Sequence, residues 1–283
     1  MISGFLILDK PAGITSHDLV ARARKILETK KIGHAGTLDP MATGLMVLGI
    51  ESATRLLDYI VAGRKRYLAT IKLGELTLTD DKEGEIIETF PIDENFINHA
   101  KEKLKAMAGE IDQVPSSISA IKVAGKRAYQ LARDGVKPEL KPRKVTIHSL
   151  DIVSEGWFGG SYQIDIEVSC SAGTYIRSIA RDIGGHLISL RRVEVAPFSI
   201  EDCREIDEGN IISAASAVAK LMPLRHLTFE EVAELKFGRA LDARSEIKNE
   251  ICAGISPEGK LVALLRESNE RARPIAVFSK ELG

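Results

Sequence analysis

The chain has 283 residues, 44% of them hydrophobic and 28% charged, and its formal net charge is −1. This composition is typical of a globular protein and excludes extended disorder, and the length allows one large domain plus a small one. No apolar run reaches the roughly 18 residues of a membrane span, and no basic region precedes the short apolar stretch at the start, so we expect a cytoplasmic protein without membrane contact.

The predicted elements of the first half alternate between strands and helices. Residues 5–9 read as a strand, and residues 15–31 read as a helix with Ser16 as its N-cap and two lysines at its end. A continuous apolar strand over 44–50, a helix over 52–63 that Gly63 ends, and a strand over 66–74 follow. Residues 74–88 are acidic and rich in turns, and residues 95–109 form an amphipathic helix.

The second half begins with a basic excursion over residues 111–143, with a short helix around Lys126 to Arg133. Strands are predicted over 144–154 and 161–170, and a helix over 173–190 has apolar residues on one face as far as Leu187. A strand over 191–200, a helix over 210–220 and a linker over 221–226 come next. A capping box from Thr228 to Glu231 then opens a helix that ends at Gly238, and three short strands complete the chain.

The basic residues fall into clusters although the chain is nearly neutral. Between Lys122 and Lys144, eight lysines and arginines stand against two acidic residues. Smaller clusters are residues 30–31, 64–66 and 191–192. One such cluster is usually a solvated face, but four of them make a polyanionic partner a fair hypothesis.

The three cysteines, Cys170, Cys203 and Cys252, are widely spaced. Their spacing fits neither a zinc site nor a disulfide framework. We therefore expect buried thiols and no metal site.

The segment GHAGTLDP, residues 33–40, places an aspartate directly before a proline, and Asp39 has two interpretations. Proline restricts the preceding residue, and aspartate is a favoured N-cap, so spacing alone favours a helix cap. The polar neighbours His34 and Thr37, and glycines that let a ligand approach the backbone, favour a chemical role. A phosphate loop lacks its lysine here, and no GxSxG or HExxH motif completes a hydrolase.

Arg177 is a second residue that calls for explanation. It falls in the first turn of a predicted helix that begins near Thr174, where the helix dipole disfavours a cation. A phosphate or a carboxylate could compensate for this. If the carboxylate is that of Asp39, the arginine would keep it ionised even when a substrate excludes water.

Four segments in the same order resemble the bacterial tRNA pseudouridine-55 synthases, the TruB family. They are LDKPAGITSHDLVARARKILETKKIGHAGTLDPMATGLMVLGI, KRYLATIKLGELTLTDDKEGEI, DQVPSSISAIKVAGKRAYQLAR and GTYIRSIARDIG, and the resemblance spans about residues 5–200. It implies isomerisation of a T-loop uridine of tRNA to pseudouridine, without cofactor or metal. It also implies an α+β fold, with a mixed, mainly antiparallel central sheet flanked by helices and an RNA-binding cleft across it.

The resemblance assigns roles residue by residue. Asp39 matches the catalytic aspartate, Arg177 the arginine that pairs with it, and Tyr67 the tyrosine that stacks on the base and assists proton transfer. Without the resemblance, Tyr67 would be a core aromatic of an alternating strand. The implied substrate-binding set is His34, which takes part in displacing the base, Tyr175 and Leu190 of the uracil pocket, and Lys10 of the lysine-proline motif. The glycine-containing loop itself adds Gly36 and Thr37 as expected substrate contacts.

The resemblance also divides the chain. Residues 1–224 would form the catalytic domain, and residues 225–283 a small, PUA-like β module that contacts RNA. The excursion at about 111–144 resembles a mobile RNA-clasping insertion, whose expected phosphate contacts are Lys122, Lys126, Arg127, Arg143 and Lys144. The partner would be the T-arm of tRNA, bound by a monomer. A non-catalytic tRNA-binding or tRNA-folding protein on the same scaffold is the alternative.

The chain departs from the family pattern at two places. Ser116 stands where the family usually has the second of two prolines, which makes the local turn less rigid. The segment before Leu190 is about six residues shorter than is usual, so the placement of Leu190 is less secure than that of Asp39. Neither departure touches Asp39, Tyr67 or Arg177.

Overall fold

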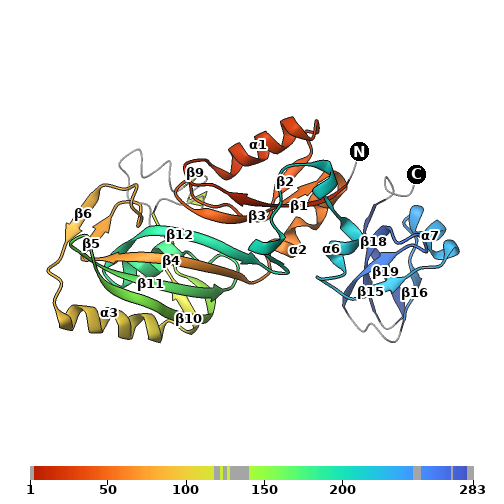
Figure 1. The fold of residues 1–283 in the computed structure, drawn as a ribbon. Helices are drawn as coiled ribbons and strands as arrows, with labels where there is room; N and C mark the ends of the chain where they lie inside the picture. Colours follow the sequence, from red (N-terminus) through yellow and green to blue (C-terminus); the bar gives the residue numbers. More distant parts are fainter. Residues whose placement is uncertain are drawn as a thin grey trace.

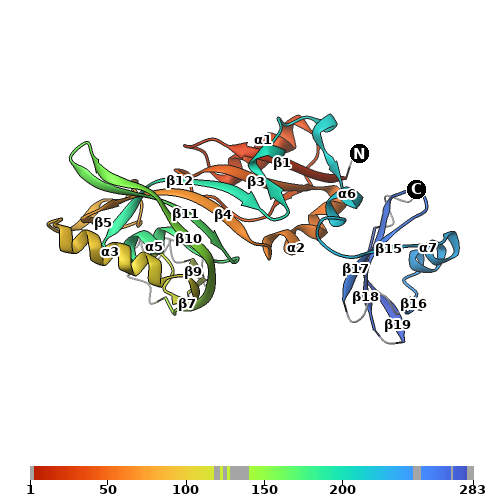
Figure 2. The same ribbon diagram turned by 60° about the horizontal axis from the view of Figure 1, so that its bottom comes forward.

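The computed structural model describes residues 3–117, 122–123, 126–127, 140–244, 250–268 and 270–278. Within these ranges the protein is an α+β fold with a ten-stranded sheet, a five-stranded sheet and two small hairpin sheets (Figure 1). The ten-stranded sheet carries the helices of the larger part, and the five-stranded sheet lies at one end of it, next to α6 (Figures 1 and 2).

The large sheet has the order β14-β1-β3-β12-β4-β11-β10-β7, with β2 added to β3 and β13 added to β12. Among the described strands of this sheet, β3 and β12 make its parallel pair and the other pairs are antiparallel, which confirms the predicted mixed sheet. Its strands are β1 (Gly4–Lys10), β2 (Ile32–His34), β3 (Thr43–Ile50), β4 (Lys65–Leu73), β7 (Gly109–Gln113), β10 (Arg143–Phe158), β11 (Ser161–Cys170), β12 (Gly185–Val195), β13 (Phe198–Ser199) and β14 (Ile212–Ser213).

Helices cover both faces of this sheet. Buried residues of α1, α3 and α5 share one hydrophobic core, and those of α2 and α6 share a second core on the other face. The helical elements are α1 (Ser16–Ile26), η1 (Glu51–Leu56), α2 (Leu57–Val61), α3 (Glu94–Ala106), α5 (Ile176–Asp182), η2 (Ile200–Asp202), η3 (Glu208–Asn210) and α6 (Ala214–Val218). The hairpin strands are β5 (Glu75–Thr77), β6 (Ile86–Thr89), β8 (Lys122–Val123) and β9 (Lys126–Arg127).

The N-cap of the first helix lies one residue earlier than the sequence predicted. Thr15, not Ser16, is the N-cap, because its side chain accepts a bond from the Asp18 amide while the Asp18 carboxylate accepts from the Thr15 amide. Ser16 is buried, and its hydroxyl donates to the Leu38 carbonyl and accepts from the Leu38 amide. Ser16 therefore ties the helix to the loop that contains Asp39.

The predicted helix over residues 173–190 is wrong in its second half. Helix α5 ends at Asp182, Gly184 has a φ of +83°, and β12 begins at Gly185. A β-bulge between Leu187 and Ser189 places both Leu187 and Leu190 in the core. Two buried residues three positions apart also fit one face of a helix, so the hydrophobic periodicity predicted a helix at this position.

Four further predictions need correction. Residues 52–63 are mainly a 3-10 helix followed by a short α2, and residues 210–220 are η3, β14 and α6 instead of one helix. Lys126 and Arg127 belong to strand β9, while the rest of the short helix predicted there lies outside the described residues. The linker prediction is wrong for Leu224–His226, which is strand β15.

The five-stranded sheet has the order β15-β17-β18-β19-β16 and carries α7 (Phe229–Lys236). Its strands are β15 (Leu224–His226), β16 (Leu241–Asp242), β17 (Ile251–Ile255), β18 (Leu261–Glu267) and β19 (Arg271–Val277). The predicted capping box of Thr228 and Glu231 and the helix end at Gly238 are confirmed. This sheet shares a core with the large one, where Phe278 and Leu264 join Phe5.

The three cysteines are free thiols. Cys170 and Cys252 are buried as expected, whereas Cys203 is half-buried. Among the described helices, none is long and apolar enough to cross a membrane.

Candidate active site

Asp39 lies in the loop between β2 and β3, residues 35–42, which we call the Asp39 loop. The Asp39 carbonyl accepts from the Ala42 amide at 3.1 Å, so Asp39 opens a tight turn in which Pro40 takes the second position. No helix begins at Pro40, and the helix-cap interpretation is wrong. The Asp39 side chain is 34% exposed, which leaves its carboxylate open to a ligand.

Arg177 binds this carboxylate through two nitrogens. Its Nε lies 2.9 Å from Oδ2 of Asp39 and its Nη2 lies 3.2 Å from Oδ1. Arg177 is the second residue of α5, and only 7% of its side chain is exposed. A two-point pair of this kind fixes the orientation of the carboxylate.

The turn after β5 completes the surroundings of Arg177. Nη1 of Arg177 donates to the Thr79 carbonyl at 2.8 Å, and Nε of Arg177 lies 3.9 Å from a carboxylate oxygen of the buried Asp81. Asp81 is held in turn by the Thr79 hydroxyl. The sequence pattern indicates only an acidic turn here and assigns Asp81 no role. The sequence feature that could have indicated Asp81 is a pair of adjacent aspartates among threonines, in a segment that otherwise resembles a surface loop.

Asp80, the neighbour of Asp81, is strained and buried. Its φ is +61°, which is uncommon for a residue other than glycine, and its carboxylate lies 3.4 Å from Nη1 of Arg181. Burial raises the pKa of Asp80, while hydrogen bonding to Ser116 and the charges of Arg181 and Arg177 act in the opposite direction. Strain of this kind is concentrated at functional sites.

Tyr67 lies in the middle of β4, between Val168 of β11 and Arg192 of β12. It is 7% exposed and belongs to the main hydrophobic core. Burial is the largest influence and raises the pKa of Tyr67, whereas the charge of Arg192 and hydrogen bonding to it lower the pKa. The phenol is therefore neutral near pH 7, and Asp39 is close enough for its charge to contribute to the shift.

The buried ammonium of Lys10 is hydrogen-bonded to the Asp39 loop. Its side chain is fully buried, and its ammonium donates to the carbonyls of Pro11 at 2.9 Å, Ile14 at 2.8 Å and Pro40 at 3.3 Å. Burial lowers the pKa of this ammonium. The Lys10 side chain thus contacts the loop that carries Asp39, whereas the sequence predicts a contact with substrate.

The chain is similar to known proteins over almost its whole length. Residues 24–176 match the family model described as TruB family pseudouridylate synthase (N terminal domain), and residues 222–279 match the one described as tRNA Pseudouridine synthase II, C terminal. A tRNA pseudouridine synthase B of Arthrobacter sp. (strain FB24) is 44% identical over 99% of this chain and 97% of its own length. That of Paenarthrobacter aurescens (strain TC1) is 45% identical over 99% and 96%.

The chain belongs to the TruB family of pseudouridylate synthases.

Solved structures support the fold. A chain of an H/ACA RNP bound to a substrate RNA containing 2'-deoxyuridine superposes with a TM-score of 0.70 at 22% identity, covering 97% of this chain and 84% of its own. A chain of a Cbf5-Nop10-Gar1 complex gives 0.70 at 24% identity, covering 97% and 83%. At this level of identity the likeness concerns the fold.

Tyr175 and Leu190, the residues that the resemblance to the TruB family assigns to the uracil pocket, lie at the start of α5 and on β12. Tyr175 is the N-cap of α5 and is half-buried, and the side-chain amide of Gln113 holds its backbone from both sides. The Tyr175 amide donates to Gln113 Oε1 at 2.8 Å, and Gln113 Nε2 donates to the Tyr175 carbonyl at 3.0 Å. Leu190 is 7% exposed and lies opposite Ala69 of β4. Gln113 is buried, and nothing in the sequence pattern marks it as a functional residue.

Ser116, the departure from the family pattern, is fully buried beside Arg177. Its hydroxyl accepts from Nη1 of Arg177 at 3.2 Å and donates to the Thr79 carbonyl at 3.4 Å. A proline at this position would have no hydroxyl to offer. Ser116 thus links the base of the insertion to the arginine that holds Asp39.

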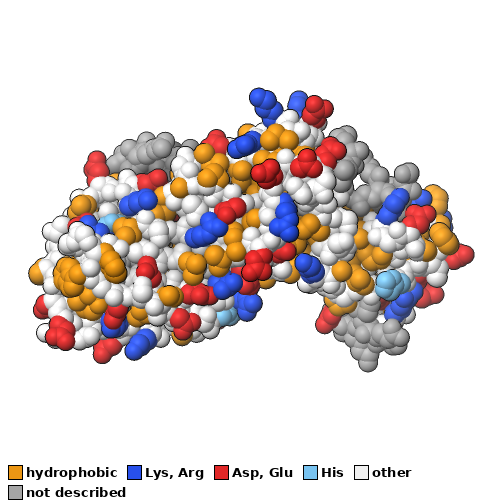
Figure 3. Space-filling view, in the orientation of Figure 1, with side chains coloured by type: hydrophobic (Ala, Val, Ile, Leu, Met, Phe, Trp, Pro, Cys, Tyr) orange, Lys and Arg blue, Asp and Glu red, His pale blue; other side chains and the backbone are white. Residues whose placement is uncertain are grey.

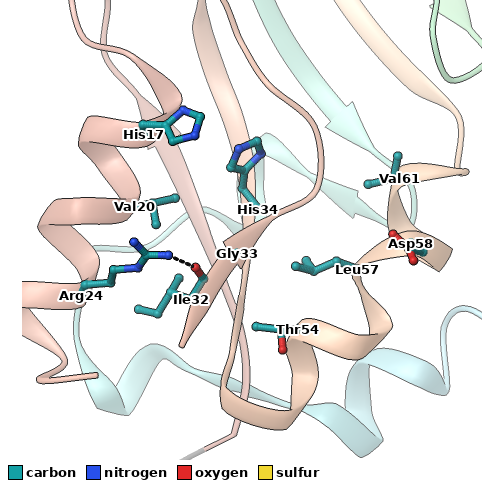
Figure 4. A pocket seen from close by; sticks show the side chains of 10 residues that line it. All are labelled: His17, Val20, Arg24, Ile32, Gly33, His34, Thr54, Leu57, Asp58 and Val61. Atoms are coloured by element: carbon teal, nitrogen blue, oxygen red, sulfur yellow. Dashed lines mark hydrogen bonds between the residues drawn. The ribbon is translucent and has the colours of Figure 1, made fainter. Parts of the chain in front are cut away.

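His34 closes β2 and faces a cavity of about 360 Å³ between α1 and α2 (Figure 4). Its ring meets that of His17 edge to face, with 5.8 Å between the ring centroids. Burial is the main cause that lowers the pKa of His34, followed by the charges of His17 and Arg192. The lining residues are His17, Val20, Arg24, Ile32, Gly33, His34, Thr54, Leu57, Asp58 and Val61.

The predicted phosphate contacts are only partly described. Arg143 and Lys144 are exposed at the start of β10, and Lys144 forms a surface ion pair of 2.7 Å with Glu110. The backbones of Lys122, Lys126 and Arg127 form the β8–β9 hairpin, and their side chains lie outside the described residues. On the face shown in Figure 3, basic side chains are interspersed with acidic ones.

Three residues of the smaller basic clusters form ion pairs with carboxylates. Arg64 and Arg66 form ion pairs with Glu194 and Glu167, and Arg191 pairs with Asp9. Arg192, counted with them, is 1% exposed and faces inward. Among the described residues, no group of three or more metal-ligating side chains is arranged to hold a metal ion.

Proposed function

We propose that this protein isomerises uridine-55 in the T-loop of tRNA to pseudouridine, with Asp39 as the catalytic carboxylate. The observation that carries the proposal is the part-exposed carboxylate of Asp39, held at both oxygens by the buried Arg177 and near enough to the buried Tyr67 for its charge to act on the phenol. Membership of a pseudouridylate synthase family and relatives named tRNA pseudouridine synthase B support it.

The reaction breaks the N1–C1′ bond of uridine and forms a C5–C1′ bond. It moves one proton from C5 to N1 and involves neither net oxidation nor net addition of water. An ionised carboxylate is a suitable group, because it can attack the ring, attack C1′ or remove a sugar proton. All three routes use the charged carboxylate, and the guanidinium of Arg177 stays paired with it when the substrate displaces water.

The target base must leave the folded loop of the RNA before it can react. In the proposed complex the base stacks against Tyr67, with Tyr175 and Leu190 lining its pocket and His34 taking part in its displacement. Gly36 and Thr37 leave room for it along the backbone of the Asp39 loop. The neutral phenol of Tyr67 is suited to proton transfer at the base.

We also propose that the two parts of the chain have separate roles. Residues 1–224 would bind and convert the T-arm as a monomeric catalytic domain in the cytoplasm, and residues 225–283 would form a PUA-like module that contacts RNA away from the target. The separate family models for residues 24–176 and 222–279 support such a division.

The decisive experiment measures pseudouridine directly. Purified protein is incubated with an unmodified tRNA transcript, and pseudouridine is mapped by carbodiimide adducts and primer extension. Wild type is expected to modify position 55, whereas Asp39→Ala and Asp39→Asn lose at least about 1000-fold in rate. A transcript with cytidine at the target position is the control. A wild type that binds the transcript but leaves the uridine unchanged would refute the enzyme and support the non-catalytic tRNA-binding alternative.

A second experiment concerns the insertion at 111–144. We expect Lys126→Gln with Arg127→Gln to weaken tRNA binding and to lower the slope of log affinity against log salt by about one per lost phosphate contact. Lys103→Gln with Lys105→Gln, on helix α3, removes the same charge elsewhere and is the matched control. An unchanged affinity and slope in the insertion variant would rule out this role.

A further inference from the structure

Arg192 lies where strands of the large sheet meet. Strand β12 pairs with β4 along most of its length, but it pairs with β3 only at Arg191 and Arg192. The cross-strand partners of Arg192 are Tyr67 on β4 and Gly44 on β3. A Cβ atom at Gly44, whose φ is +106°, would come within 2.2 Å of the Arg192 carbonyl oxygen, so only glycine allows this contact of backbones.

The Arg192 side chain joins both ends of the Asp39 loop. Its Nε donates to the Leu45 carbonyl at 2.8 Å, on the strand that follows the loop. Its Nη2 donates to the Gly36 carbonyl at 3.1 Å, and its Nη1 lies 3.4 Å from the Thr37 carbonyl. Gly36 and Thr37 precede Asp39 by three and two residues, so one planar guanidinium fixes the path of the backbone that presents the carboxylate.

The charge of Arg192 has no carboxylate partner among the described ion pairs. The side chain is 1% exposed, and besides the three carbonyls its guanidinium meets the sulfur of Met46 at 3.5 Å. An arginine keeps its proton even when buried. A buried charge balanced only by dipoles acts strongly on its surroundings, and that of Arg192 helps to lower the pKa of Lys10, His34 and Lys65.

We propose that Arg192 is a positioning residue for the isomerisation, fixing the loop that presents Asp39 and supplying a buried positive charge beside Tyr67. The proposal rests on the proposed function. When the Tyr67 hydroxyl gives up or shares its proton during transfer at the base, negative charge develops on its oxygen. The adjacent guanidinium stabilises that charge in a site from which water is excluded.

The test compares Arg192→Lys, which keeps the charge but loses the planar set of donors, with Arg192→Met, which keeps much of the length and loses the charge. Single-turnover rates are measured with saturating protein, and affinity is measured with RNA that already contains pseudouridine. We expect Arg192→Met to lose about 100-fold in rate with an affinity within about threefold of wild type, and Arg192→Lys to lose about tenfold. Arg191→Met, a surface neighbour paired with Asp9, is the matched control.

A second readout separates positioning from simple support of the fold. The protein is labelled with 3-fluorotyrosine, the Tyr67 signal is assigned with Tyr67→Phe, and its titration is followed by fluorine NMR. The ionisable groups that act on Tyr67 are Arg192, Cys170 and Asp39, and only the first is changed. We expect the Tyr67 midpoint to rise in Arg192→Met and to stay near that of wild type in Arg192→Lys.

The outcomes are distinct. If Arg192→Met does not fold, as judged by circular dichroism, a rate loss in Arg192→Lys with wild-type melting still supports the proposal. Equal losses of rate and affinity, wild-type rates in both variants, or an unmoved Tyr67 midpoint in folded Arg192→Met would overturn it. A wild type without activity would refute the proposed function, whereas active wild type with equally active variants refutes only the role of Arg192.

Discussion

Arg177 and Asp39, 138 residues apart in the chain, meet in a two-point ion pair in which Nε and Nη2 of the arginine lie 2.9 and 3.2 Å from the two carboxylate oxygens. The arginine is buried, whereas about a third of the aspartate side chain remains exposed. The pair therefore has a fixed inner half and an accessible outer half. This asymmetry suits a carboxylate that must be held in one orientation and still reach a substrate.

The first prediction concerns this pair. Arg177→Lys keeps the charge but replaces two directed hydrogen bonds with a single point contact. We expect turnover of tRNA to fall by about 10- to 100-fold, the size expected from losing one hydrogen bond to a charged group. Affinity for tRNA should change much less. Single-turnover kinetics and filter binding measure the two quantities, and equal losses in both would identify Arg177 as a phosphate contact instead.

The second prediction concerns the phenol of Tyr67. Tyr67→Phe keeps the aromatic ring in the core and removes only the hydroxyl, so we expect a stability change within about 1.5 kcal/mol and a rate loss of about 100-fold or more. Thermal melting and single-turnover assays check the two parts. Tyr162→Phe, on the neighbouring strand β11, is the control. A fully active Tyr67→Phe enzyme would leave the residue with a packing role only.

The third prediction concerns the buried ammonium of Lys10. Lys10→Met removes the donor shared by three carbonyls, including that of Pro40, and should cost at least about 1 to 3 kcal/mol of unfolding free energy as well as turnover. Lys65→Met is the matched control, because Lys65 is also buried and binds the carbonyls of Val61 and Gly63. It should lose stability and keep turnover within about threefold. If both variants lose turnover equally, Lys10 has no special link to the Asp39 loop.

The fourth prediction concerns pH and His34. Its pKa is lowered from the ordinary value of 6.5, so the unfolded chain binds this proton more readily than the folded chain. The stability contributed by neutral His34 is therefore complete above the unfolded pKa and is lost as the pH falls through the folded pKa. Melting temperatures between about pH 7.5 and about pH 5 should fall less for His34→Gln than for wild type. The exposed His99→Gln is the control, and a fall in His34→Gln as steep as in wild type would contradict the prediction.

The fifth prediction concerns the five-stranded sheet. Arg225 is 2% exposed and binds the fully buried Glu267 at 2.7 Å and Glu231 at 2.6 Å. Arg225→Met leaves the buried Glu267 without its cation and should cost about 3 to 5 kcal/mol, seen as faster hydrogen exchange in β17 and β18. Adding Glu267→Gln removes the unpaired buried charge and should restore much of the loss. Unchanged exchange rates in the single variant would show that the pair contributes little.

The sequence predicted the elements whose signals are local. The strands β1, β3, β4, β10 and β11, the helix α3 and the capping box of Thr228 follow from periodicity and cap chemistry within a few residues. The pattern failed where a bulge broke the alternation of β12, since Leu187 and Leu190 then take a helical spacing. It failed again at Leu224–His226, because a three-residue strand is defined by its partner β17 more than by its own residues.

The sequence by itself determined that Asp39 sits in a glycine-containing turn before a proline, and its resemblance to a family proposed which residues take part in catalysis. Only the tertiary structure decided what surrounds them. Asp81, Ser116 and Arg192 approach the site across long stretches of chain, and Lys10 turned out to hold the loop. The physical reason is that backbone preferences act between neighbours, whereas the partner of a buried charge is fixed by the register and packing of strands that are remote in sequence.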